Sequence, residues 1–233
     1  MLSQKNKIII LKDVTVKYEQ RVILPDVNLD IHEGDFVAIT GPNGGGKTTL
    51  LRVILGLLKP VKGQVEFYKN GLRVNALKVG YLPQKNMIDS RFPITVKEVI
   101  ESGLLHGKTL FSRKVTETEM MSIDEVLKLI GMEDYRNESI GNLSGGQLQR
   151  TLFGRAIISN PDVLVLDEPL SYLDKTFETR LYEIISDLSK TKTIILVSHE
   201  MTQISQMATR HVIVDHSIHD CHAEHHYIRT DCE

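Results

Sequence analysis

One run of eight residues limits the fold of this chain more than any other feature: Gly41-Pro42-Asn43-Gly44-Gly45-Gly46-Lys47-Thr48. It lies between a predicted strand at 35–40 and a predicted helix at about 46–57, the context that a phosphate-binding loop (P-loop) requires. Glycines let backbone amides turn toward phosphate oxygens at a helix N-terminus, where the dipole favours negative charge. We predict that Lys47 reaches the β- and γ-phosphates of a nucleotide and that the Thr48 hydroxyl contacts Mg²⁺. The alternative is a glycine-rich turn with an incidental lysine.

Short apolar segments on both sides of the middle of the chain predict a parallel α/β core. Strands are expected at 8–11, 14–18, 27–31, 35–40, 64–68 and 79–83, and again at 163–166, 193–197 and 211–214. A helix is expected at 175–189, and a short one begins at Met201. Segments this short and continuously apolar are typical of strands in a buried parallel sheet.

The middle of the chain is predicted to be helical, from about residue 95 to residue 159. Two pairs of residues are candidate capping boxes, Thr95 with Glu98 and Ser122 with Glu125. No internal repeat is visible, so we expect one domain at 1–215 with a helical insertion at about 88–159. Residues 216–233 differ in composition and are treated as a separate C-terminal tail.

Composition excludes several classes of protein. The net charge of −2 gives no general attraction to nucleic acid or anionic lipid. The apolar runs at 8–11 and 53–58 are too short for a signal-peptide core or for the roughly 20 residues of a membrane span. The two cysteines, Cys221 and Cys232, both lie in the tail, which excludes a disulfide framework and fits a reducing cytosolic setting.

A second functional pattern is an apolar strand that ends in two acids, Val163 to Leu166 followed by Asp167 and Glu168. Ligands of parallel α/β folds bind at the C-terminal edge of the sheet. Neighbouring side chains on a strand point in different directions, so the two carboxylates can take different roles. Asp167 is predicted to hold Mg²⁺, through water, and Glu168 to act as the general base on the attacking water. The alternative is a solvated strand end with acids for solubility.

A third pattern is the loop at residues 143–147, which reads Leu-Ser-Gly-Gly-Gln. Ser144 and Gln147 form a candidate capping box for a helix that ends near Ser159. Two glycines in a first helical turn cost roughly 1 kcal/mol each against alanine, which a cap alone does not require. Bare amides beside a serine hydroxyl also make an anion site. We expect this loop both to cap its helix and to contact phosphate.

Leu143 to Gln147 is identical to the signature of the ABC ATPase family and precedes the Asp167–Glu168 strand at that family's spacing. The chain resembles this family over roughly residues 8 to 215. The resemblance implies an α/β fold: a P-loop NTPase core with a mostly parallel sheet, an N-terminal antiparallel β subdomain and an inserted helical signature subdomain. It also implies an ATPase that works as a head-to-tail dimer, in which the signature loop of one copy closes over ATP held by the other.

Four further positions resemble motifs of the family. Tyr18 resembles the aromatic residue that stacks on adenine, unless it is an ordinary strand tyrosine. Gln84 resembles the Q-loop glutamine that senses Mg²⁺ and the membrane partner. Asp174 ends a D-loop-like run in which Tyr172 is bulkier than the usual residue, and it could instead simply cap the next helix. His199 resembles the switch histidine at the γ-phosphate, and its expected place at a sheet edge favours that role over a structural one. Glu200 follows it where the family more often has Asp.

The resemblance thus implies three sets of site residues. The catalytic set is Glu168, His199 and Gln84. The nucleotide-binding set is Tyr18, Gly41, Asn43, Gly44, Gly45, Gly46, Lys47, Thr48, Thr49, Ser144, Gly145, Gly146, Gln147 and Asp174. The Mg²⁺ set is Thr48, Gln84 and Asp167.

The tail departs from the family pattern after Val214. Five of the nine histidines of the chain lie within residues 216–226. Imidazole and thiolate favour Zn²⁺ and its neighbours, so we name a candidate zinc set: His216, His219, Cys221, His222, His225 and His226. The alternative is a solvated terminus, because the spacing of a zinc finger is absent.

Residues 41–52 and 55–60 resemble the ATPases of zinc/manganese importers, some of which have histidine-rich ends. Import of a transition metal such as zinc is therefore the leading hypothesis; the alternatives are an ABC transporter ATPase for a non-metal cargo and a soluble ABC ATPase of DNA repair or translation. Expected partners are ATP, a second copy of the chain, permease subunits and, for an importer, an extracytoplasmic binding protein, but no nucleic acid. The expected location is peripheral, at the cytoplasmic face of a bacterial or archaeal cell membrane.

Overall fold

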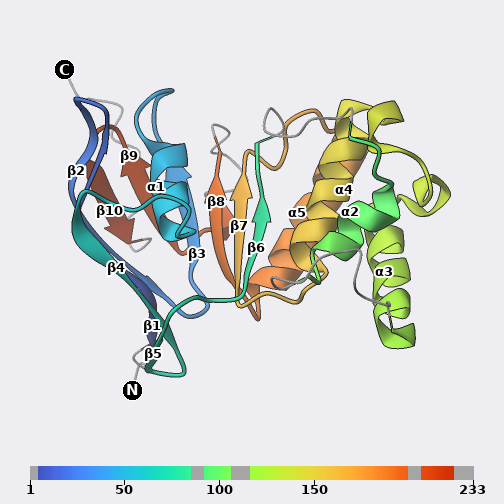
Figure 1. The fold of residues 1–233 in the computed structure, drawn as a ribbon, viewed down its shortest axis with the longest axis horizontal. Coiled ribbons are helices and arrows are strands. Elements are labelled where there is room, and N and C mark those ends of the chain that lie inside the picture. Colours follow the sequence, from blue (N-terminus) through green and yellow to red (C-terminus); the bar gives the residue numbers. More distant parts are fainter. Residues whose placement is uncertain (1–4, 85–91, 106–115, 199–205, 223–233) are drawn as a thin grey trace. The chain divides into compact units, whose positions relative to one another are not determined.

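The fold begins with two long antiparallel strands, β1 (Lys7–Tyr18) and β2 (Arg21–His32), in a sheet of order β2-β1-β4-β5 (Figure 1). Strands β4 (Lys62–Lys69) and β5 (Leu72–Val74) complete this sheet, and both of their pairings are antiparallel. The register of β1 shifts between Leu11 and Val14, where Asp13 has a φ of 50°. This bulge explains why the sequence pattern predicts two strands at 8–11 and 14–18 where the structure has one.

The protein is represented by a computed structural model that describes residues 5–84, 92–105, 116–198 and 206–222. The chain divides into two units, one of residues 1–76 with 195–233 and one of residues 77–194. Strand β8 (Thr193–Val197) begins in the second unit and ends in the first.

The first unit also contains the strand order β10-β9-β3-β8. β3 (Phe36–Thr40) is parallel to β9 (Arg210–Val214), and β10 (Ile218–His222) is antiparallel to β9. Every residue of β3 is buried, as expected of a continuous apolar strand covered on both faces. Helix α1 (Lys47–Ile54) follows β3 after six residues, and those six residues form most of the P-loop.

The second unit combines the strands β6 (Val79–Leu82) and β7 (Val163–Asp167), which are parallel, with β8 beside β7. Helices α2 (Val96–Ser102), α3 (Glu117–Ile130) and α4 (Gly145–Ile157) contact one another (Figure 1). Two short 3₁₀ turns, η3 (Glu133–Tyr135) and η4 (Ile140–Asn142), lie between α3 and α4. Helix α5 (Lys175–Ser189) follows β7.

Gly154 shows why α4 can approach its neighbours closely. A Cβ atom at this position would lie 2.9 Å from Cδ1 of Ile130 and 3.4 Å from Cγ1 of Ile100. The helical segment has an apolar core, in which Ile100, Ile123 and Phe153 are each exposed by 1% or less. Burial of side chains of this size stabilises the fold by about 1.5–3 kcal/mol each.

The predicted architecture is confirmed: an antiparallel N-terminal sheet, a sheet with parallel pairs and a helical middle segment. The capping boxes Thr95–Glu98 and Ser144–Gln147 are also confirmed. The box predicted at Ser122 is wrong, because Thr116 and Glu119 cap α3 and the Ser122 hydroxyl donates to the Thr118 carbonyl within the helix. The strands β5 and β10 were not predicted from the sequence pattern, and the start of the helix expected at Met201 lies outside the described residues.

Candidate nucleotide-binding and signature sites

The P-loop of the first unit packs backbone against backbone on the end of β9. A Cβ atom at Gly41 would lie 2.1 Å from the Val214 carbonyl oxygen, and one at Gly45 would lie 2.6 Å from the same atom. The amide of His216 donates to the Gly45 carbonyl at 2.9 Å. Side chains larger than hydrogen therefore do not fit at these two positions, which gives a physical reason for glycine there.

Lys47, the first residue of α1, folds back over the P-loop. Its Nζ atom donates to the carbonyl oxygens of Gly41 and Pro42, each at 2.9 Å, and the residue is 7% exposed. Gly46 is the N-cap with a φ of 108°, and no acidic side chain lies in the first turn of α1. The helix N-terminus, its free amides and a lysine ammonium therefore lie together, an arrangement that suits a phosphate group.

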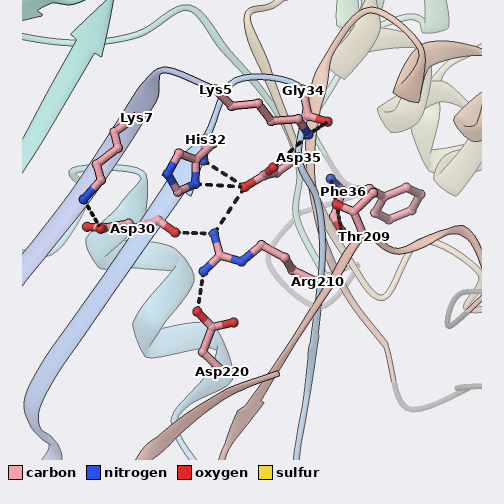
Figure 2. A network of polar contacts seen from close by, with 10 residues as sticks. All are labelled: Lys5, Lys7, Asp30, His32, Gly34, Asp35, Phe36, Thr209, Arg210 and Asp220. Atoms are coloured by element: carbon pink, nitrogen blue, oxygen red, sulfur yellow. Dashed lines mark hydrogen bonds and ion pairs between the residues drawn. The ribbon is translucent and has the colours of Figure 1, made fainter. Parts of the chain in front are cut away.

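A buried polar network holds together the strands that support the P-loop (Figure 2). The Arg210 guanidinium on β9 bonds to Asp35, which precedes β3, at 3.2 Å, and to Asp220 on β10. The amide of His32 also donates to Asp35, at 2.9 Å. The amide of Phe36 donates to the Thr209 hydroxyl at 3.0 Å. This network fixes the beginning of β3, whose other end leads into the P-loop.

At the end of β7 in the second unit, the two predicted acids occupy different environments. Asp167 is the last strand residue and is 2% exposed. Glu168 leaves the strand with a φ of 54°, a left-handed conformation that is uncommon outside glycine. The side-chain amide of Gln149, on α4, donates to the carbonyl oxygens of Glu168 and Pro169, each at 3.3 Å. The left-handed backbone at Glu168 gives a physical reason for the predicted difference in direction between the two carboxylates.

The signature loop lies at the N-terminus of α4. The Ser144 hydroxyl accepts from the Gln147 amide at 3.3 Å, and the Gln147 side chain accepts from the Ser144 amide at 2.8 Å. A Cβ atom at Gly146 would lie 2.9 Å from the Tyr172 carbonyl oxygen, so the first turn of α4 touches the D-loop-like segment. A pocket of about 580 Å³ opens here, lined by Ser144, Gly145, Gly146, Gln147, Arg150, Tyr172 and Asp174 among others.

Asp174 connects the signature helix to α5. Its Oδ1 atom accepts from the Phe177 amide at 2.9 Å as the N-cap of α5, and its Oδ2 atom pairs with Arg150 on α4. The guanidinium carbon of Arg150 also lies 4.0 Å from the centroid of the Phe177 ring. The hydrogen bond from the Phe177 amide, reinforced by the charge of Arg150, lowers the pKa of the Asp174 carboxyl. The capping role expected as an alternative is present, beside a contact with the signature helix.

The other predicted site residues lie apart from these contacts or outside the described chain. Tyr18 ends β1 and is 41% exposed, and Gln84 is exposed two residues after β6. His199 lies outside the described residues, directly after the buried Ser198. Asn43 is exposed on the P-loop, and Thr48 and Thr49 are half-buried in the first turn of α1.

The tail is described only to residue 222. His216 and His219 are exposed, Cys221 and His222 belong to β10, and His225 and His226 lie outside the described residues. Within the described part of the chain, no three His, Cys, Asp or Glu side chains are grouped so that they could hold a metal ion. The same residues include no helix long and apolar enough to cross a membrane.

Sequence reasoning did not identify Gln149, Arg150 and the Arg210–Asp35 pair. Gln149 and Arg150 lie two and three residues after the signature loop, and this position was the one local signal for them, but their partners lie 19 to 24 residues away. Arg210 and Asp35 are 175 residues apart in the chain. Such pairings depend on the tertiary fold and have no local pattern.

Three features together define an ATP-binding cassette. They are a P-loop before a short helix, two acids at the end of a buried strand, and a glycine-rich signature loop on a helical insertion. Residues 24–171 match the family described as "ABC transporter", so the chain belongs to the ABC transporter family. It is the ATP-hydrolysing subunit of such a transporter, and the resemblance found in the sequence is confirmed.

Individual relatives agree with this assignment. The chain is 39% identical over 199 residues to the high-affinity zinc uptake system ATP-binding protein ZnuC of Bacillus subtilis, covering 84% of this chain and 86% of that protein. It is 38% identical over 218 residues to a "probable metal transport system ATP-binding protein" of Thermotoga maritima, covering 93% and 84%. Among solved structures, the dimeric post-hydrolysis state of the cassette MJ0796 bound to ADP and Pi superposes with a TM-score of 0.77 at 28% identity, covering 93% and 99%.

Proposed function

We propose that this chain hydrolyses ATP to power the import of a transition metal ion, with zinc as the favoured cargo. The observation that carries the proposal is the identity with relatives named for zinc uptake, 39% for ZnuC of Bacillus subtilis and 36% for ZurA of Listeria monocytogenes. These matches cover 84% and 92% of this chain, so they are not limited to the motifs common to all ABC ATPases.

Zinc uptake by cells that express the chain with its membrane subunits tests this proposal. ATP-dependent zinc accumulation should be lost when Lys47→Ala removes the ammonium group from the P-loop. Manganese and a non-metal solute serve as competing cargoes. The proposal would be contradicted if Lys47→Ala left zinc accumulation unchanged. It would also be contradicted if Lys47→Ala abolished uptake of the non-metal solute alone.

The proposed nucleotide contacts follow the chemistry of each residue. The P-loop amides, Lys47 and Thr49 bind the phosphates, Tyr18 stacks on adenine, and the signature residues of one copy contact ATP held by a second copy. Thr48, Gln84 and Asp167 offer oxygen donors, the ligand type that Mg²⁺ prefers, so the donor set fits that ion. When bound, Mg²⁺ neutralises charge on the phosphates.

The proposed chemistry is activation of one water molecule by Glu168. Its carboxylate accepts the proton as the water attacks the γ-phosphate, and His199 contacts that phosphate and holds the attacking geometry. Head-to-tail closure of two copies excludes bulk water and aligns the reacting groups. Gln84 and the helical subdomain (about 88–159, within a single domain at 1–215) transmit the change to permease subunits at the cytoplasmic face of the membrane. An extracytoplasmic binding protein delivers the cargo.

The tail, residues 216–233, is proposed to bind Zn²⁺ through its histidines and Cys221. The support is the donor chemistry: imidazole and thiolate suit Zn²⁺, and six such groups lie within residues 216–226. Truncation after Asp215 is a poor test on its own, because it also removes β10, which pairs with β9 along five residues. A loss of zinc binding would then not distinguish a lost metal site from a disturbed sheet.

A combined His→Asn variant at positions 216, 219, 222, 225 and 226 keeps the backbone of β10 and removes the imidazoles. In a zinc competition titration with ATPase activity followed in parallel, it should lose tight zinc binding that the native chain shows. Equal zinc affinity of the two proteins would show that the tail is not a metal site, while the ATPase assignment would be unaffected.

A further inference from the structure

Gln149 is a buried polar residue that the proposed chemistry does not use. It lies on α4, two residues beyond the signature loop, and is 1% exposed. Its Nε2 atom donates to the carbonyl oxygens of Glu168 and Pro169, each at 3.3 Å. Its Oε1 atom is buried without a hydrogen-bond partner in the described structure. A flipped amide would direct Oε1 at two carbonyl oxygens, so only the donor orientation is chemically acceptable.

The unpartnered Oε1 atom indicates that this amide has a role beyond packing. Burying a polar atom without a partner costs about 1–3 kcal/mol. Methionine or leucine would fill a similar volume at a purely structural position without that cost. The two hydrogen bonds that the amide donates are the contribution that such an apolar side chain could not make.

Those two bonds hold the backbone where it is strained. Glu168 has a φ of 54°, and a non-glycine residue in the left-handed region costs roughly 1–2 kcal/mol. Tyr172, four residues later, is also left-handed, with a φ of 69°. Such conformations persist only where surrounding contacts enforce them. By fixing the carbonyls of residues 168 and 169, Gln149 fixes the peptide planes on which the direction of the Glu168 side chain depends.

Helix α4 contacts the same loop at two further points. A Cβ atom at Gly146 would lie 2.9 Å from the Tyr172 carbonyl oxygen, and Arg150 pairs with Asp174. Three successive parts of the loop between β7 and α5 are thus held by one helix, the helix that carries the signature loop. Through the two bonds from Gln149, a displacement of α4 would be transmitted to the backbone of Glu168.

We infer that Gln149 is a positioning residue for ATP hydrolysis, which keeps the Glu168 carboxylate in its reactive orientation by holding the carbonyls of Glu168 and Pro169. This inference rests on the proposed role of Glu168 as the general base. It adds to the hydrolytic machinery a residue outside the P-loop, the signature loop and the two acids at the end of β7, and it makes α4 the element that supports the base.

Gln149→Met tests the inference because it keeps the length of the side chain and removes the donor. The expected result is a fall in kcat of about ten- to a hundredfold, as for a misplaced catalytic group, with KM for ATP and ATP affinity within about twofold. Thr151→Val is the matched control: Thr151 is buried on the same helix, and its hydroxyl donates only to the Gln147 carbonyl, at 2.9 Å. It should leave kcat within about twofold. Gln149→Asn, which withdraws the amide by one methylene, gives the same test if Gln149→Met does not fold.

A double-mutant cycle shows whether Gln149 acts through Glu168. In the Glu168→Gln background, Gln149→Met should lower the residual turnover by less than about twofold, because the group it positions is already gone. An equal fall in both backgrounds, or an unchanged kcat in the native background, would overturn the inference. Near-normal turnover of Glu168→Gln alone is a distinct outcome: it would refute the assignment of the base, and the inference with it.

Discussion

Arg210 Nη1 lies 3.2 Å from Asp35 Oδ2, and each of these side chains is only 6% exposed. The guanidinium also pairs with Asp220 of β10 (Figure 2). One arginine therefore joins the consecutive strands β9 and β10 to the turn before β3, which lies 175 residues away in the sequence. The strand that begins at this point, β3, leads into the P-loop.

Arg210→Met should lower the free energy of unfolding by about 3–5 kcal/mol, because it leaves buried carboxylates without their partner. Denaturant unfolding measures this change. Lys190→Ala, which removes an ion pair with Asp187 at 70% and 74% exposure, should cost less than about 1 kcal/mol. If the two variants lost equal free energy of unfolding, the buried network would stabilise the fold no more than an exposed ion pair does.

The stability of the fold should depend on the ionisation of Asp35. Burial alone raises the pKa of its carboxyl, but hydrogen bonds from the His32 amide, Lys5 and Arg210 together lower it below its ordinary value of 3.8. Because the folded pKa is the lower one, this carboxylate contributes its full stabilisation above the ordinary value. The contribution is lost as the pH falls through the lowered folded value.

Unfolding free energies measured between about pH 7 and about pH 2 should therefore fall more steeply for the native chain than for Asp35→Asn. The residues whose side chains face the carboxylate, Lys5, His32 and Arg210, are the same in both proteins, so the comparison tests the carboxylate of Asp35. Parallel curves would show that its ionisation is not linked to folding.

Gly45→Ala should weaken ATP binding on the order of tenfold or more, about 1.4 kcal/mol, because the added methyl group meets the Val214 carbonyl at 2.6 Å. Gly71→Ala is the control. Gly71 has a φ of 77° in the turn between β4 and β5, where a Cβ atom meets nothing within 4 Å. It should cost about 1 kcal/mol of stability and leave nucleotide affinity unchanged. Equilibrium nucleotide titration distinguishes the two, and an unchanged affinity for Gly45→Ala would be inconsistent with a packed P-loop.

Ser144→Ala and Thr116→Ala remove the same kind of helix cap, since each hydroxyl accepts from the N3 amide at 3.3 Å. Each should lower the free energy of unfolding by about 1 kcal/mol. Only Ser144→Ala should also lower ATP turnover, because the proposed site includes Ser144 and not Thr116. Turnover that falls equally in both variants would show that the effect of Ser144 is only structural.

Local signals in the sequence predicted much of this fold. The run before Lys47 and the apolar strand before Asp167 are local patterns, and the structure places both at the expected strand ends. The Thr95 and Ser144 capping boxes were found by the same reasoning. The Ser122 prediction failed because the same capping pattern occurs inside a helix, and the earlier Thr116 box was overlooked.

Contacts between distant segments could not be predicted in this way. β10 pairs with β9 through backbone hydrogen bonds that do not require an apolar sequence, and the polar segment from Ile218 to His222 therefore gave no strand signal. The left-handed conformation of Glu168 and its bonds from Gln149 depend on how α4 packs against the loop after β7. The sequence identified Glu168 as an acid at the end of a strand, but it contained no local signal for the contacts that hold the backbone of Glu168.

Glu168→Gln is the decisive variant for the proposal that this chain hydrolyses ATP with Glu168 as the general base. The variant keeps the size of the side chain and removes the group that accepts the proton. Steady-state hydrolysis and the oligomeric state in the presence of ATP and Mg²⁺ should be measured on the same preparation. Turnover should fall to a small residual rate, while ATP still binds and holds two copies together as a stable dimer. Persistent near-normal hydrolysis would contradict it.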